Sequence, residues 1–68
     1  MSVTVDARGL RCPWPVLRLA RAMRTVDAVT IVADDPAAPR EIAALAAAQG
    51  WTILHRNGEI SVSRDPPQ

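Results

Sequence analysis

Residues 5–17 read Val-Asp-Ala-Arg-Gly-Leu-Arg-Cys-Pro-Trp-Pro-Val-Leu, and this stretch decides the fold of the chain. It follows on from an alternating, half-buried strand pattern over residues 3–6 and contains Gly9, which is free to adopt conformations that other residues avoid. Two prolines then follow, and prolines are tolerated in the first turn of a helix but not in its interior. The stretch therefore predicts a strand, a loop and a helix that begins near Cys12 and runs to about Arg24.

A second helix is predicted after a nearly all-apolar, central strand at residues 29–33. Residues 34–36 read Asp-Asp-Pro, and an acidic residue followed by proline is a helix-start signal in which the carboxylate caps the helix. We prefer this capping role to metal binding by the two acids. The helix is expected to begin at Pro36 or only at Pro39, and Gly50 is expected to end it.

The remaining sequence is typical of a hairpin. Residues 51–55 and 60–63 have strand patterns, and Asn57-Gly58 between them is a strong hairpin signal. The resulting β-α-β-α-β-β order predicts an α/β chain of the two-layer α+β sandwich type, with two helices on one face of a four-stranded mixed sheet. We expect the other face, with its Thr and Ser positions, to meet solvent or a partner.

Length and composition exclude several classes of protein. The chain has 68 residues, one Cys, one His and a net charge of +1. We expect a single domain over residues 1–64 and a frayed tail at residues 65–68, with Arg64 at the start of that tail. Neither an internal disulfide nor a zinc site can be formed, and we expect no metal or cofactor.

The charge and hydropathy patterns predict the cellular compartment of the protein and the kinds of partner that it does not bind. No signal peptide is recognisable, and no apolar run is long enough to cross a bilayer. The small net charge does not favour direct nucleic-acid binding. We therefore expect a cytoplasmic monomer that does not associate with membranes.

Cys12 is the candidate reactive residue. At a helix N-terminus, unpaired N–H groups and the positive end of the helix dipole favour a thiolate. Arg8 and Arg11 on the same loop add positive charge, so we expect the pKa of Cys12 to lie below its ordinary value. Pro13 and Pro15 are expected to stiffen the turn together with Gly9. The alternative is a buried structural cysteine, because Cys is among the most buried residue types.

The isolation of this thiol restricts its chemistry. A cysteine hydrolase needs a histidine base, and nothing in the sequence places His55 near Cys12. A mixed disulfide or a persulfide formed with a second protein requires only one accessible, activated thiol. Three functions remain open, namely a sulfur carrier, a regulatory interaction module on the same fold, and a single-cysteine thiol sensor.

Two motifs resemble those of the TusA-like, or SirA-like, sulfur-carrier family. Residues 5–17 contain an Asp, then Gly-Leu, then Cys-Pro-x-Pro opening a helix, and residues 33–42 resemble the family's Asp-Asp-Pro turn and second-helix start. The resemblance implies that Cys12 holds sulfur as a persulfide, taken from a cysteine desulfurase or a rhodanese-type donor and passed to an acceptor protein. Uses in that family include tRNA thiolation, molybdenum cofactor synthesis and sulfur oxidation.

The first helix has two distinct faces in its sequence. An apolar stripe for the core is formed by Val16, Leu19, Ala20 and Met23. The opposite face carries Trp14, Leu17, Arg18 and Arg21, which we call the Trp14 face. A cluster of exposed Trp, Leu and Arg beside a reactive thiol is typical of an interface hot spot, so we expect it to bind a partner. The alternative is a solvated arginine face.

Overall fold

The computed structural model describes residues 2–64, and the tail expected at residues 65–68 lies outside them. The predicted order of strands and helices is confirmed. The elements are β1 (Ser2–Asp6), α1 (Trp14–Ala22), β2 (Ala28–Val32), α2 (Ala38–Gln49), β3 (Thr52–Arg56) and β4 (Glu59–Ser63).

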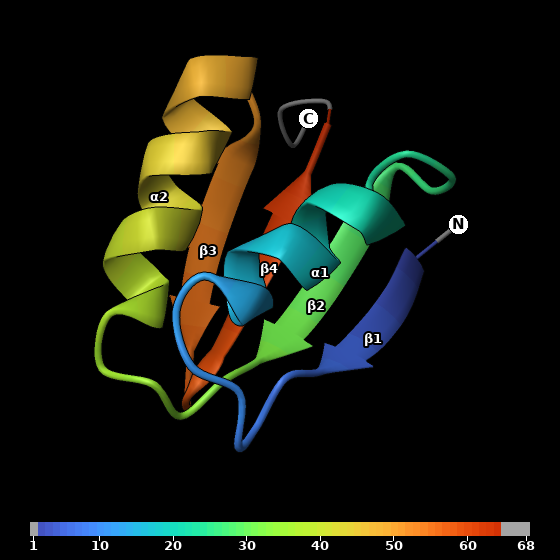
Figure 1. Cartoon of the computed structure of the whole chain (residues 1–68). Helices are drawn as coiled ribbons and strands as arrows, with labels where there is room; N and C mark the ends of the chain where they lie inside the picture. The colour runs from blue at the N-terminus through green and yellow to red at the C-terminus, as the bar shows by residue number, and fades with distance from the viewer. Residues whose placement is uncertain (1, 65–68) are drawn as a thin grey trace.

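The four strands form one mixed sheet in the order β1-β2-β4-β3, with both helices on one face (Figure 1). The pair β1–β2 is parallel, and β4 runs antiparallel to both of its neighbours, β2 and β3. The strand expected to be central, β2, is an inner strand. In register, Thr4 lies opposite Thr30, which lies opposite Ser61, so the uncovered face carries the predicted hydroxyl side chains.

The core lies between the sheet and the two helices. Leu19 of α1, Met23 at its C-cap and Ile42 of α2 are fully buried, and they pack against alternate residues of the inner strands. Of the predicted stripe on α1, Val16 and Ala20 are only half-buried, whereas Pro15, expected to stiffen the turn, is fully buried. The loop of residues 7–13, which carries Cys12 and which we call the thiol loop, therefore enters α1 next to a proline that packs into the core.

The first helix begins slightly later than the sequence predicted, and the second begins between its two predicted starts. Pro13 is the N-cap of α1, so Cys12 lies one residue outside the cap, and α2 begins at Ala38 rather than at either proline. In the part of the chain that is described, no side chain caps either helix. The prediction that the acidic pair caps α2 is wrong in that neither carboxylate accepts a first-turn N–H of the helix; Asp35 bonds instead to the N–H of the N-cap residue Ala37 and to the thiol-bearing loop, and Asp34 bonds to that loop alone.

Two predicted turns are confirmed, the end of α2 at Gly50 and the hairpin at Asn57-Gly58. Gly50 has a φ of 76° and ends α2 in the left-handed conformation that glycine tolerates. Asn57 and Gly58 have φ values of 48° and 81°, as the two central residues of a tight hairpin turn require. The hairpin joins β3 to β4 with Arg56 opposite Glu59.

Arg64, the last residue of the expected domain and the first of the proline-bearing stretch expected to fray, is held in place by several contacts. Its backbone N–H donates to Asp27 O at 2.9 Å, and its guanidinium donates to the carbonyl oxygen of Met23. The guanidinium also lies 6.0 Å from the centre of the Trp51 ring. Arg64 thus fastens the end of β4 to the C-terminal end of α1.

Candidate functional site

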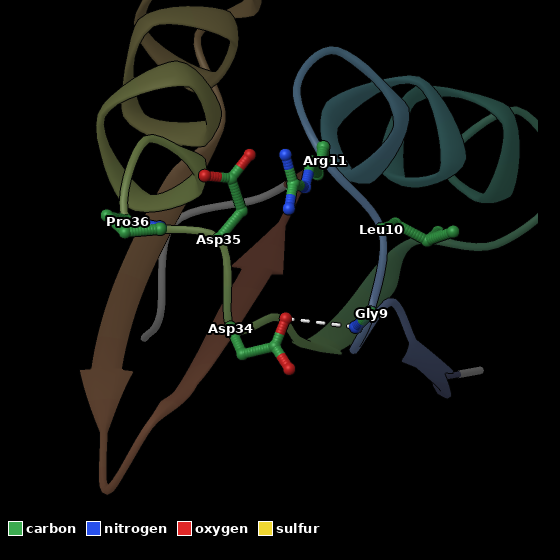
Figure 2. A pocket seen from close by; sticks show the side chains of 6 residues that line it. All are labelled: Gly9, Leu10, Arg11, Asp34, Asp35 and Pro36. Carbon is green, nitrogen blue, oxygen red and sulfur yellow. Dashed lines mark hydrogen bonds between the residues drawn. The ribbon is translucent and has the colours of Figure 1, made fainter.

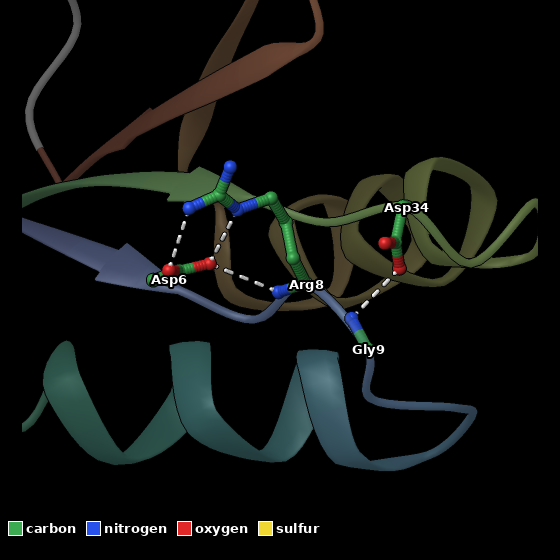
Figure 3. Close-up of polar contacts among 4 residues, drawn as sticks. All are labelled: Asp6, Arg8, Gly9 and Asp34. Atoms are coloured by element: carbon green, nitrogen blue, oxygen red, sulfur yellow. Dashed lines mark hydrogen bonds and ion pairs between the residues drawn. The ribbon is translucent and has the colours of Figure 1, made fainter.

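Two neighbouring carboxylates fasten the thiol loop to the turn after β2. Asp34 Oδ1 accepts the N–H of Gly9 at 2.9 Å, as Figure 3 shows, and Asp35 Oδ2 accepts the N–H of Cys12 at 2.6 Å. The other oxygen of Asp35 accepts the N–H of Ala37 at 3.1 Å. Ionised acceptors make stronger hydrogen bonds than neutral ones. The acidic pair therefore holds the loop that carries the thiol against the start of α2.

The Cys12 side chain is exposed and hydrogen-bonded to the carboxylate of Glu41. Its Sγ donates a hydrogen bond to Glu41 Oε2 at 2.6 Å. Glu41 belongs to the first turn of α2, where the helix dipole favours a negative charge. The second oxygen of this carboxyl, Oε1, is buried and has no hydrogen-bond partner among residues 2–64.

The pKa of Cys12 is raised above its ordinary value, not lowered as the sequence predicted. The hydrogen bond to Glu41 is the largest cause, because it stabilises the protonated thiol. Partial removal of the sulfur from water and the negative charges of Glu41 and Asp35 act in the same direction. The thiol of the free protein is therefore held in its protonated form.

The helix dipole gives Cys12 little help for reasons visible at the start of α1. Pro13 and Pro15 have no N–H groups to offer, and the N–H of Trp14 donates to Arg11 O at 2.8 Å. The backbone N–H of Cys12 itself is taken by Asp35, as described above. The donors that the sequence argument assigned to a thiolate are missing or used.

The two loop arginines have different surroundings. Arg8 forms an ion pair with Asp6 at 2.9 Å (Figure 3), and this contact lowers the pKa of Asp6 to about 2. Its guanidinium is thus engaged with Asp6, so the expectation that it stabilises the thiolate is not met. Arg11 lines a hollow of about 480 Å³ between the thiol loop and the turn after β2 (Figure 2).

The turn residues of the loop behave largely as expected. Gly9 has a φ of 82°, a left-handed conformation that side chains with a Cβ rarely adopt. Pro13 and Pro15 flank the first helical residue, and the buried ring of Pro15 anchors the turn. The Cys12–Pro13 peptide bond is cis, which the sequence did not predict.

The Trp14 face is exposed beside the thiol. Trp14 has 59% of its surface exposed and Leu17 has 48%, and Arg18 and Arg21 are also exposed. This exposure agrees with the predicted division of α1 into a core face and an outer face. His55 is exposed on the edge strand β3, beside the hairpin.

Comparison with known proteins gives this arrangement a family. The family model described as Sulfurtransferase TusA matches residues 3–63. The chain belongs to the TusA family. A solved SirA-like protein from Desulfitobacterium hafniense is similar in structure, with a TM-score of 0.72 and 30% sequence identity. That likeness covers 88% of this chain and 90% of the other.

Membership of the TusA family confirms the resemblance that the two motifs predicted, and it makes the chain a sulfur carrier of the sulfurtransferase class. Within residues 2–64, no helix is long and apolar enough to cross a membrane. The same residues hold no cluster of three or more His, Cys, Asp or Glu side chains suited to a metal ion.

Sequence reasoning missed the two acidic residues that act on the thiol of this TusA-family chain. Asp35 was interpreted as a possible helix cap, and Glu41 was not considered as a site residue. Both lie in the second motif, residues 33–42, so the signal was present in the sequence. Only the fold brings them to Cys12, across separations of 23 and 29 residues.

Proposed function

We propose that this protein relays sulfane sulfur as a persulfide on Cys12. The observation that carries the proposal is an exposed, conformationally anchored single thiol in a chain of the sulfurtransferase family. The donor is a cysteine desulfurase or a rhodanese-type protein, and the acceptor is a second protein. The pathway supplied is tRNA thiolation, molybdenum cofactor synthesis or sulfur oxidation, and the compartment is the cytoplasm, where thiols stay reduced.

The transfer step needs the thiol of Cys12, the donor persulfide and a base that accepts the Cys12 proton. The Cys12 sulfur attacks the terminal sulfur of the donor's S–SH group, the donor's S–S bond breaks, and the donor sulfur leaves as a thiolate. The proton of Cys12 leaves the sulfur as the new S–S bond forms. The exposed position of Cys12 supports this step, because the two sulfur atoms must touch.

The Trp14 face is proposed as the surface that docks donor and acceptor. Trp14, Leu17, Arg18 and Arg21 are all exposed, and Trp14 lies two residues from the thiol. Large aromatic and Arg side chains carry much of the binding energy at protein interfaces. A partner on this face would have its own reactive group within reach of Cys12.

The raised pKa of Cys12 weakens one rival function. Redox-sensing cysteines rely on a high thiolate fraction at neutral pH. Here Glu41 and Asp35 act against the thiolate, so a single-cysteine sensor is disfavoured. A regulatory interaction module would use the Trp14 face without needing the thiol, and the experiment below separates it from a carrier.

Mass spectrometry of the intact protein tests the carrier function. The protein is incubated with a cysteine desulfurase and cysteine, or with a rhodanese and thiosulfate. We expect a gain of one sulfur that reductant removes and that is absent in Cys12→Ser. If neither donor loads the wild type while a partner still binds Cys12→Ser, the carrier function is wrong and the interaction module is favoured.

A further inference from the structure

Sulfur transfer requires Cys12 to lose its proton, and Glu41 is hydrogen-bonded to the sulfur that carries this proton. We propose that Glu41 is a catalytic residue of sulfur transfer, which takes the Cys12 proton during loading and returns it during discharge. This inference rests on the proposed carrier function. It adds that the loaded state is the less stable one, so that sulfur is driven onward.

Both ends of the contact are held in place. Cys12 is fixed through its backbone N–H, which Asp35 accepts at 2.6 Å, and Glu41 is fixed in the first turn of α2. The contact itself joins Sγ to Oε2 at 2.6 Å. A general base must lie within hydrogen-bond reach of the proton that it removes, and Glu41 meets that condition in the resting protein.

Loading moves one proton and exchanges one S–S bond. The Cys12 sulfur bonds to the terminal sulfur of the donor persulfide, the donor's S–S bond breaks, and the electron pair of that bond leaves on the donor sulfur. The proton of Cys12 passes to Glu41 Oε2. The products are a donor thiolate, the Cys12 persulfide and a protonated Glu41, and the total charge is unchanged.

Discharge runs the same exchange in the opposite direction. An acceptor thiolate attacks the terminal sulfur of the Cys12 persulfide, the Cys12–S bond to that sulfur breaks, and Glu41 returns the proton to the departing Cys12 sulfur. The products are an acceptor persulfide, the Cys12 thiol and the Glu41 carboxylate. The hydrogen bond seen between Sγ and Oε2 is thereby restored.

The environment of Glu41 makes the loaded state the costlier one. Its Oε1 is already buried without a partner, and loading removes the S–H donor from Oε2 as well. In the Cys12 persulfide the remaining S–H sits on the outer sulfur, one S–S bond beyond Sγ, so Oε2 loses the donor that Sγ gives it in the unloaded protein. The unloaded thiol keeps that hydrogen bond.

Chemical loading tests this balance without any partner protein. The inorganic tetrasulfide ion transfers one sulfur to the thiol and leaves as the trisulfide ion. Added hydrosulfide then removes that sulfur from Cys12 and leaves as the inorganic disulfide ion. The loaded fraction is read at equilibrium by intact mass for wild type and Glu41→Gln. We expect Glu41→Gln to need roughly threefold or more hydrosulfide for half-unloading, because its amide carries no charge and offers N–H donors.

The pH profile of alkylation by iodoacetamide, an uncharged reagent, provides the second readout. We expect Glu41→Gln to react faster than wild type at pH 7 and to show a lower pH midpoint, because the hydrogen bond to a carboxylate no longer holds the proton on sulfur. Glu59→Gln is the matched control, since it makes the same change on β4, and it should behave as wild type. Thermal unfolding verifies that each variant is folded, and Glu41→Ala replaces Glu41→Gln if the latter is not.

The two hypotheses fail in different ways. If wild type and Glu41→Gln share the same half-unloading concentration and the same pH midpoint, the role of Glu41 is overturned while the carrier function stands. If desulfurase and rhodanese both fail to load the wild type, the carrier function is overturned, and the proposed transfer role of Glu41 falls with it. A difference between the variants in both readouts, together with enzymatic loading, supports the proposal.

Discussion

At the scale of the single residue, the neighbours of Cys12 lower the reactivity of its thiol. The hydrogen bond to Glu41 and the nearby negative charges hold the proton on sulfur, although the side chain is exposed to solvent. Since the thiolate is the reactive form of cysteine, indiscriminate oxidation or alkylation of the free protein is slowed. A partner that disturbs the contact between Sγ and Oε2 would release this restraint at the moment of docking.

The wild-type thiol should therefore titrate above the ordinary range of cysteine. Alkylation rates measured against pH should give a midpoint above that of a free cysteine thiol, the opposite of what the helix dipole alone predicts. Asp35→Asn should lower the midpoint less than Glu41→Gln, because Asp35 acts on the sulfur through charge alone. A wild-type midpoint below the free-thiol value would contradict the observed contact with Glu41.

The ion pair between Asp6 and Arg8 predicts a stability change in acid. The folded pKa of Asp6 is lowered from 3.8 to about 2, first by hydrogen bonds from Arg8. Because the unfolded chain binds the proton more tightly, the stabilisation is complete above pH 3.8 and is lost as the pH falls through about 2. The difference in urea midpoint between wild type and Asp6→Asn should shrink over that interval, and a constant difference would show that the pair does not titrate with folding.

At the scale of the elements, the turn after β2 and the thiol loop form one unit through Asp34 and Asp35. Asp35→Ala removes the acceptors of the Cys12 and Ala37 N–H groups, and we expect it to cost about 1–2 kcal/mol of unfolding free energy. Hydrogen exchange at the Cys12 amide should accelerate in this variant. An unchanged exchange rate would mean that the contact does not persist in solution.

The two faces of α1 predict opposite effects of truncation. Leu19→Ala removes a fully buried side chain and should cost about 2–5 kcal/mol of unfolding free energy. Trp14→Ala truncates an exposed side chain, so it should change that free energy by under about 0.5 kcal/mol while slowing sulfur transfer to a partner. Urea unfolding and transfer rates measure the two effects, and a large stability loss in Trp14→Ala would place that side chain in the core.

The elements could be predicted because their signals are local. Alternation identified β1 and β4, a nearly all-apolar run identified β2, Gly50 identified the end of α2, and Asn57-Gly58 identified the hairpin. The surroundings of Cys12 could not be predicted in the same way, because Glu41 meets the sulfur only after both helices pack on the sheet. The wrong sign of the thiol's pKa shift follows from judging its electrostatics by the nearest residues in sequence.

At the scale of the whole molecule, Arg64 closes the end of the sheet that lies away from the thiol. Its guanidinium contacts Met23 O and the Trp51 ring, so Arg64→Ala should lower the unfolding free energy by about 1 kcal/mol. Sulfur loading of Cys12 should be unaffected, because the contacts lie at the opposite end. Urea unfolding together with the mass assay measures both effects, and a loss of loading in the folded variant would show that the two ends are coupled.

The register of the sheet has a practical consequence for joining this domain to others. Ser2 and Ser63 lie in one row across the strands, through Ala28, whereas the thiol loop leaves the far end of β1 (Figure 1). Ser2 and Ser63 therefore lie at the end of the sheet opposite the loop that carries Cys12. An affinity handle joined at either of these two positions would be attached to the sheet at the end away from Cys12, so the thiol itself would stay accessible to a partner.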